Sequence, residues 1–337
     1  MIHDRLRLHL AGAAAAAALT MSTALAQDVT FTAGTIGVPA MISTQELENF
    51  AKEVGEESGG RIEIKVYTNS QLGSGQEQME AVAFGTQDIF LSALSEASRL
   101  VPSFGALDAA FLFKDEDHVR RFMESDMWST LETRLADEFG VGIITANWFD
   151  LPRHLLHREK FISEVEDVAG VRVRAPGIPM YIQNYINMGA EPITIAYGEQ
   201  YLALSQGVVD MTESAADRIM GLKLHEVAPY ITEADMMFPL SALYVNQAKW
   251  DALSEEDRAM MSRLAQDAAD RAMARTRDSW GEVKATIEAE GGKFQPMPEE
   301  TRAAFAEMAT RNLDDMESSG LFPEGWYQAI LDLRDAE

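Results

Sequence analysis

Strand-like and helix-like stretches alternate from the start of the folded part of the chain, and this order restricts the fold more than any other feature. "DVTFTAG" (Asp28–Gly34) and "RIEIKVY" (Arg61–Tyr67) show the period of two that is typical of strands. Between them the pattern predicts a helix over 44–57 that ends at Gly59-Gly60. A helix of this length is a suitable crossover between parallel strands. We therefore predict an α/β fold that opens with a β-α-β unit.

A helix-Gly-x-x-Asp-strand pattern occurs twice in the chain. Gly85 and Asp88 follow the first helix, and Gly207 and Asp210 follow the second, 122 residues later. Glycine suits the left-handed backbone that commonly ends a helix. Two such units predict two lobes of similar build, and chance similarity between two capped helices is the alternative.

Three segments are expected to connect the lobes. Strand patterns at Gly140–Pro152 and Met236–Gln247 indicate two hinge strands. Helical spacing continues from Ser254 to about Glu290, some 35 residues against a usual mean of about 11 to 12, and this helix is expected to span both lobes. We expect lobe I to comprise 27–151 plus about 239–279, lobe II to comprise 152–238 plus about 280–337, and a ligand cleft to lie between them.

The N-terminus has the pattern of a secretory signal peptide. Arg5 and Arg7 precede an apolar run, Leu10–Met21, and small residues follow at Ala24–Ala26. The apolar run is too short to span a bilayer. We predict a signal peptide over 1–26, cleavage before Gln27, and a mature protein in the periplasm with no membrane insertion.

The charge balance restricts the partners. The chain has 28 Lys and Arg residues against 54 Asp and Glu residues, a formal net charge of -26, which argues against nucleic acid and anionic lipid. Solubility or a saline habitat is an alternative reason for this acidity. The chain has no cysteine, so it has no disulfide, thiolate metal site or cysteine nucleophile.

Catalytic and metal motifs are missing from the sequence. It contains no Gly-x-Ser-x-Gly, no phosphate-binding glycine loop and no His-Glu-x-x-His. His154 and His157 lie three residues apart without an accompanying set of carboxylates, and His118 and His225 are expected to be structural. We predict no catalytic residue, no metal site and no cofactor.

The stretch "GVRVRAPGIP" (Gly170–Pro179) predicts a binding site. Arg172 and Arg174 lie on one face of a strand, and a helix is expected to begin near Pro179. Ligands of open α/β sheets bind at the carboxyl ends of strands, a helix N-terminus favours anions, and guanidinium matches a carboxylate. We expect Arg174 to bind an anionic ligand and Arg172 to pair with Glu164 or Glu166. An internal salt bridge is the alternative for Arg174.

Several segments resemble one protein family. "GVRVRAP" resembles the "GLKIRVP" segment of the solute-binding proteins of tripartite ATP-independent periplasmic (TRAP) transporters, of the DctP type. "MGAEPITIAYGEQYLALSQGVVD", "SQLGSGQEQMEAVAFGTQDI" and "FGALDAAFLFKDEDH" are similar to further segments of that family, in the same order. The resemblance implies a type II-like periplasmic binding protein, whose two lobes close on an organic acid.

The resemblance also implies residue roles. Arg174 matches the family's carboxylate-binding arginine, Arg153 a second arginine, Tyr197 a ring that packs on the ligand, and Ser214 a cleft asparagine. The chain departs from the family at Ser214 and at Asp235, where many members have histidine. The further ligand-binding candidates are Gly177 and Ser92, with Val38, Trp148 and Phe149 as apolar walls together with Ile36.

These matches predict a TRAP solute-binding protein that captures a small monocarboxylate and delivers it to the small and large membrane subunits. A sugar acid, an aromatic acid and a branched 2-oxo acid remain open, and the departures argue against the most hydroxylated sugar acids. We expect a monomer. An exported binding protein that serves a sensor is the first alternative. An exported lyase or hydrolase that uses Glu213, Asp210 or Tyr197 is the second.

Overall fold

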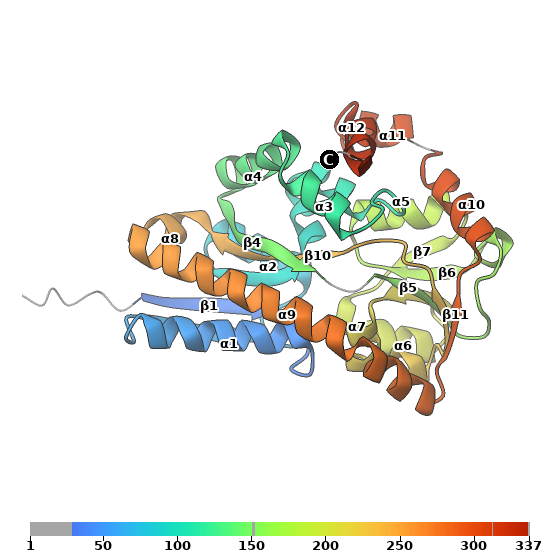
Figure 1. Cartoon of the computed structure of the whole chain (residues 1–337), viewed down its shortest axis with the longest axis horizontal. Helices are drawn as coiled ribbons and strands as arrows, with labels where there is room; N and C mark the ends of the chain where they lie inside the picture. Colours follow the sequence, from blue (N-terminus) through green and yellow to red (C-terminus); the bar gives the residue numbers. More distant parts are fainter. Residues whose placement is uncertain (1–28, 150–151, 312, 336–337) are drawn as a thin grey trace, which may run out of the picture.

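The strands form two separate sheets, one in each lobe (Figure 1). The computed structural model describes residues 29–149, 152–311 and 313–335; the predicted signal peptide and its cleavage site lie outside them. The first sheet has the order β2-β1-β3-β10-β4 and the second β11-β9-β5-β8-β6-β7. The two-lobed α/β fold is thus confirmed.

The strands of the first sheet are β1 (Val29–Thr35), β2 (Ile62–Tyr67), β3 (Ile89–Ala93), β4 (Val141–Phe149) and β10 (Leu240–Asn246). Those of the second are β5 (His154–His157), β6 (Arg172–Ala175), β7 (Glu191–Thr194), β8 (Met211–Ser214), β9 (Tyr230–Glu233) and β11 (Lys293–Pro296).

The predicted β-α-β opening is confirmed. β1 and β2 pair in parallel from Val29↔Ile62 onward, with helix α1 (Ile42–Glu57) as the crossover. Alternate residues of β1 are buried because they face the helix layer, as Phe31 does. The buried side chains of α1, among them Leu47 and Phe50, belong to the same core. The packing of α1 against the sheet determines where the carboxyl ends of β1 and its neighbouring strands lie.

The repeated helix-glycine-strand unit is present in both lobes. Helix α2 (Gly75–Phe84) ends at Gly85 with φ 73°, and β3 follows. Helix α6 (Gln200–Ser205) is followed by Gly207 with φ 70° and then by β8. Both glycines have the left-handed backbone that other residues rarely adopt. The remaining helices are α3 (Glu116–Met123), α4 (Asp126–Phe139), α5 (Pro179–Asn187), α7 (Ala216–Gly221), α8 (Gln247–Asp251), α10 (Glu299–Ala309), α11 (Leu313–Ser318) and α12 (Trp326–Asp332).

Helix α9 (Glu255–Ala289) connects the lobes, as the long helical pattern predicts. Ser254 caps it by accepting a hydrogen bond from the backbone N–H of Asp257 (3.1 Å). Figure 1 shows α9 running beside α1 and on toward the second lobe. Leu264 and Ala268 pack in the core of the first lobe, whereas Ile287 packs in that of the second. In the described part of the chain no helix is both long enough and apolar enough to cross a membrane.

The C-terminal helices differ from the expected lobe boundary. The sequence predicts 280–337 in lobe II, yet α11 and α12 lie against the first lobe (Figure 1). Met316, Phe322 and Ile330 share the core that contains Trp128 of α4. His118, structural as predicted, binds the carbonyl of Ile330 through Nε2 (2.6 Å). The apolar residues of these short helices cover the α3-α4 surface, which amphipathic spacing alone does not identify.

Candidate ligand-binding cleft

A cavity of about 470 Å³ lies between the lobes, in the size range of small-molecule sites. Its walls come from the carboxyl ends of parallel strands in both sheets. In the first lobe these are Thr35–Gly37 after β1 and Leu91–Ala93 of β3. In the second lobe they are Arg174 and Pro176 at the end of β6 and Thr194–Tyr197 after β7. The cavity therefore lies where the α/β rule places ligands.

Six of the residues predicted from the sequence line this cavity: Arg174, Arg153, Tyr197, Gly177, Ser92 and Ile36. Arg174 is 4% exposed, and its Nε donates a hydrogen bond to the carbonyl of Ile195 (2.9 Å). No carboxylate of the described residues forms an ion pair with it. Burial lowers the pKa of the guanidinium, but an arginine stays protonated in proteins. Arg174 is thus a buried cation without an ion-pair partner among the described residues; the Glu213 carboxylate acts to raise its pKa but forms its ion pair with Arg153.

Arg172, two residues before Arg174 on the same strand face, has a counter-ion. Its Nε and Nη2 donate to the two carboxylate oxygens of Asp210, each at 2.8 Å. The expected partners Glu164 and Glu166 are therefore wrong. The reason is the sheet order, because β6 lies next to β8 and Asp210 directly precedes β8. Arg172 forms a structural pair outside the cavity.

Arg153 lines the cleft but is also neutralised by the protein. Its guanidinium forms a two-pronged ion pair with Glu213, in which Nη2 donates to Oε1 at 2.8 Å and Nε donates to Oε2. Burial acts to lower the pKa of Arg153, but the Glu213 carboxylate holds it well above the usual value. The guanidinium also lies 5.9 Å from the ring centroid of Tyr181. Glu213 therefore compensates the charge of Arg153 before any ligand enters.

The two lobes touch across the cleft. The hydroxyl of Tyr197 lies 3.6 Å from Sδ of Met41, which directly precedes α1. Arg99 of the first lobe donates through Nη1 to the carbonyl of Gly177 in the second (2.8 Å). Both contacts join the two lobes at the cleft.

The lining contains nine serine, threonine and glutamine side chains: Thr35, Ser43, Ser70, Ser74, Gln76, Ser92, Ser95, Thr194 and Ser241. Apolar side chains, among them Ile36, Met41, Leu91, Ile178 and Ile195, form the other part of the lining. The hydroxyls of Ser92 and Ser95 are buried and have no hydrogen-bond partner among the described residues. Buried polar groups normally have partners. The hydroxyl of Ser92 is therefore available to a ligand, whereas the hydroxyl of Ser95 acts on the carboxyl of Asp108.

Other predicted positions lie elsewhere. Trp148 is 2% exposed and packs in the core of the first lobe because it occupies a core-facing position of β4. Val38 comes after the lining segment and faces Gly221 at the end of α7. Of the predicted apolar residues, Ile36 alone lines the cavity among those whose side chains the structure describes. The side chain of Phe149 lies outside the described residues.

Ser214 and Asp235 are also absent from the lining. Ser214 is 1% exposed within β8, opposite His154 of β5. Asp235 lies at a different hollow, where its carboxylate approaches Arg302 (3.6 Å) and His154 (3.5 Å). The ligand-binding roles that the resemblance implies for Ser214 and Asp235 therefore do not apply to this cavity.

Sequence reasoning missed Glu96, Arg99, Tyr181 and Arg218, which all line the cleft. Glu96 and Arg99 follow β3 directly, at the carboxyl end of a parallel strand. Arg174 was identified by the rule that ligands bind at the carboxyl ends of strands. The same rule applies to the residues that follow β3.

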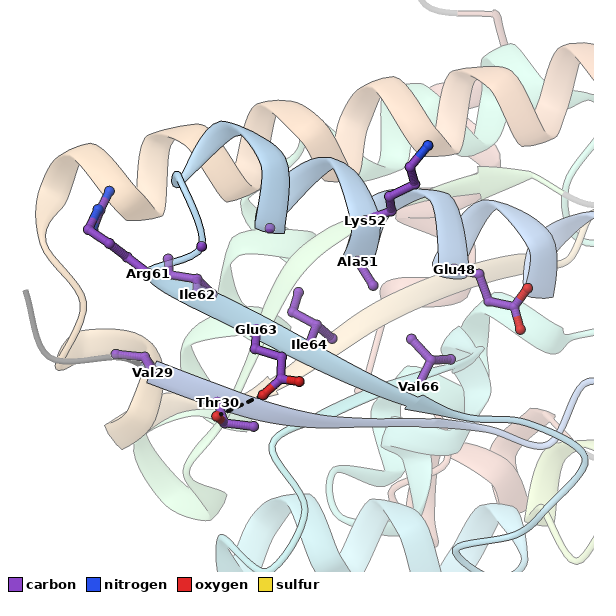
Figure 2. Close-up of a pocket in the computed structure, with 12 residues that line it drawn as sticks. Val29, Thr30, Glu48, Ala51, Lys52, Arg61, Ile62, Glu63, Ile64 and Val66 are labelled. Atoms are coloured by element: carbon purple, nitrogen blue, oxygen red, sulfur yellow. Dashed lines mark hydrogen bonds between the residues drawn. The ribbon is translucent and has the colours of Figure 1, made fainter.

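A separate hollow of about 630 Å³ lies at the outer edge of the first sheet, between α1 and the strands β1 and β2 (Figure 2). It shares no lining residue with the cleft. Its polar groups pair locally: Thr30 donates to Glu63 (3.4 Å), and Lys65 approaches the same carboxylate (3.6 Å). No group of three or more His, Asp or Glu residues in 29–149, 152–311 and 313–335 is placed to hold a metal ion. The interlobe cleft is the site with an uncompensated charge.

Comparison with known proteins gives a consistent result. The model of the family "Bacterial extracellular solute-binding protein, family 7" matches residues 34–319. A solute-binding protein of Chromohalobacter salexigens is 32% identical over 232 residues, 68% of each chain. The C4-dicarboxylate-binding periplasmic protein DctP of Rhodobacter capsulatus is 24% identical over 318 residues, 94% of this chain and 95% of that protein.

Solved structures agree with the fold. A TRAP periplasmic solute-binding protein of Chromohalobacter salexigens with bound D-glucuronate superposes with a TM-score of 0.83 at 27% identity, covering 91% of this chain and 100% of that one. One of Desulfovibrio desulfuricans with bound sn-glycerol-3-phosphate gives a TM-score of 0.82, also at 27% identity, covering 91% and 96%. Both were determined with a small anionic ligand.

Proposed function

Since the chain belongs to the bacterial extracellular solute-binding protein family 7, the periplasmic binding proteins of TRAP transporters, we propose that it captures a hydroxylated sugar acid through Arg174 and delivers it to the membrane subunits of its transporter. Its relatives are transport components and not enzymes, so the exported lyase or hydrolase is excluded. The protein belongs to a periplasmic family.

The observation that carries the proposal is the missing counter-ion of Arg174. Arg153 and Arg172 are each paired in two-pronged geometry with an acidic side chain, whereas Arg174 has no carboxylate partner among the described residues. A ligand carboxylate would fill that position and form charge-assisted hydrogen bonds in a desolvated site.

The polar lining supports a hydroxylated acid over an aromatic or branched one. Of the expected apolar walls, Trp148 and Val38 do not line the cavity and Ile36 does, whereas nine serine, threonine and glutamine side chains line it. The related Chromohalobacter structure contains D-glucuronate. Burying the hydroxyls of the lining against an apolar ligand would cost free energy, whereas sugar hydroxyls would satisfy them.

Closure links binding to delivery. A ligand that contacts both lobes stabilises the closed form, because its affinity for that form is greater. The contacts of Tyr197 with Met41 and of Arg99 with Gly177 belong to this closed arrangement. The membrane subunits would then recognise the closed protein.

Calorimetric titration of residues 27–337 tests the proposal. The ligands are D-glucuronate, D-gluconate, benzoate and 2-oxoisovalerate, with D-glucuronamide as an uncharged match for glucuronate. We expect a hydroxylated acid to bind and glucuronamide to bind at least about 30-fold more weakly than glucuronate, since losing one partner of a desolvated charge pair costs about 2 kcal/mol or more. Tight binding of benzoate or the 2-oxo acid alone, or equal binding of the amide, would contradict the proposal. Mass spectrometry of the denatured protein identifies any acid retained during purification.

A further inference from the structure

The first lobe contributes a carboxylate to the same cavity. Glu96, in the 3₁₀ helix Leu94–Arg99 after β3, is 5% exposed and lines the cleft. Its Oε2 accepts a hydrogen bond from Nε of Arg99 (2.6 Å). Its Oε1 accepts no hydrogen bond from the described residues. A carboxylate has about four acceptor positions, so Glu96 retains acceptor capacity inside the cleft.

Two features hold this carboxylate in position. Gly75 is the first residue of α2, and a Cβ at that residue would lie 2.5 Å from Oε1 and 2.9 Å from Cδ of Glu96. Glycine therefore lets the carboxylate rest against the helix N-terminus, where the helix dipole favours negative charge. Arg99 reaches the second lobe by donating to the carbonyl of Gly177 (2.8 Å), so two of its donor groups are already used.

The two sides of the cavity differ in charge. Arg174 and Arg218 come from the second lobe, whereas the first lobe contributes the ion-paired Glu96 and Arg99. An ionised carboxylate accepts hydrogen bonds and cannot donate them. A ligand whose acid group binds Arg174 must accordingly present a donor, such as a hydroxyl, toward Glu96. A second carboxylate at that end would lie beside the like charge of Glu96, while Nε and Nη1 of Arg99 are already engaged with Glu96 and Gly177, and this is unfavourable.

We propose that Glu96 is a specificity residue of the cleft, which selects hydroxylated monocarboxylates and excludes the corresponding dicarboxylates. This inference rests on the proposed function and adds the chemistry of the ligand's far end. If the Glu96–Arg99 pair were only structural, its loss would change stability and overall affinity but not the ratio between a monoacid and a diacid.

Calorimetric titration with D-gluconate and D-glucarate measures that ratio. The two acids have the same six-carbon chain and differ in a terminal CH₂OH or carboxylate. We expect the unaltered protein to prefer gluconate by at least about 30-fold and Glu96→Gln to reduce this preference by about tenfold or more, as removal of a like-charge clash implies. Glu63→Gln is the matched control. It makes the same change in net charge on the outer edge of the first lobe (Figure 2) and should leave the ratio unchanged.

Thermal melting and circular dichroism establish that each variant is folded. Equal affinity of the unaltered protein for the two acids would overturn the inference, and so would an unchanged ratio in Glu96→Gln. D-Glucuronate is titrated in parallel. If none of the three acids binds, the proposed sugar-acid function itself fails, which separates the two failures.

Discussion

The two lobes are built from the same local unit but contribute different chemistry to the cleft. In each, a helix ends at a left-handed glycine and a strand leads toward the cleft. At the end of β3 the first lobe has an acid, Glu96, paired with Arg99; at the end of β6 the second lobe has Arg174 without a carboxylate partner among the described residues. The repeated unit places Glu96 after β3, whereas Arg174 lies on β6, which precedes the corresponding unit of the second lobe. The pairing of the two side chains, and not the repeated unit, explains what they bind.

The three arginines of the second lobe also differ in whether an acidic side chain neutralises them. Arg153, Arg172 and Arg174 are close in the fold, yet two of them are neutralised by Glu213 and Asp210. A binding role follows from the missing partner and not from the residue type.

The first prediction separates a structural arginine from a binding one. Arg153→Ala leaves the fully buried Glu213 carboxylate without its partner, so we expect a loss of about 3 to 5 kcal/mol in the free energy of unfolding. Arg174→Ala leaves no buried carboxylate unpaired and should cost less than about 1 kcal/mol. Urea unfolding of the ligand-free proteins measures both. Similar losses in the two variants would contradict the distinction.

The second prediction concerns Asp108, where the first lobe meets α5 of the second. Its carbonyl accepts a hydrogen bond from Asn184 (2.7 Å), and its carboxyl Oδ2 is buried without a partner among the described residues. Burial raises the pKa of this carboxyl from its usual value of 3.8 to about 7. The unfolded chain therefore ionises at lower pH than the folded protein, and stability falls as the pH rises from about 4 to about 7.

Asp108→Asn removes this titration. From pH 4 to pH 8 we expect the stability of the unaltered protein to fall relative to the variant by about 4 kcal/mol, since each unit of pKa shift corresponds to about 1.4 kcal/mol. Unfolding by urea at both pH values gives the difference, and effects of other titrating groups cancel because both proteins contain them. A constant difference between the two proteins would show that Asp108 is ionised in the folded state.

The third prediction tests the repeated unit. Gly85→Ala and Gly207→Ala each place a Cβ at a left-handed residue, which costs about 1 to 2 kcal/mol. A Cβ at Gly85 approaches Asn246 at 3.4 Å, whereas one at Gly207 approaches Nη1 of Arg158 at 2.9 Å. Arg158 can move, so we expect Gly207→Ala to be only slightly the more destabilising, as thermal unfolding will measure. A neutral effect of either change would mean that its glycine is not required.

The sequence predicts the regular elements and one side of the cleft well. Alternation identifies β1, β2 and β6, the cap at Ser254 begins α9, and the strand-end rule places Arg174 at the cavity. These features depend on local spacing, which a single sequence contains.

Features that depend on neighbours in space are predicted less well. Alternation puts Trp148 on one face of β4 but does not say that this face is the core, and the partner of Arg172 depends on β8 lying beside β6. The packing of α11 and α12 on the first lobe likewise depends on which apolar surface is left uncovered. Glu96 could have been found from its position after β3, but its orientation into the cavity depends on the space at Gly75.

Parallel titration of Arg174→Ala and Arg172→Ala with the acid that the unaltered protein binds separates the binding arginine from the paired one. The two changes remove the same side chain from the same strand, two residues apart. We predict that Arg174→Ala weakens binding by at least about 30-fold, whereas Arg172→Ala, which breaks a partly exposed pair with Asp210, changes it by less than about threefold. Unchanged affinity in Arg174→Ala, or an equal loss in both variants, would contradict the account.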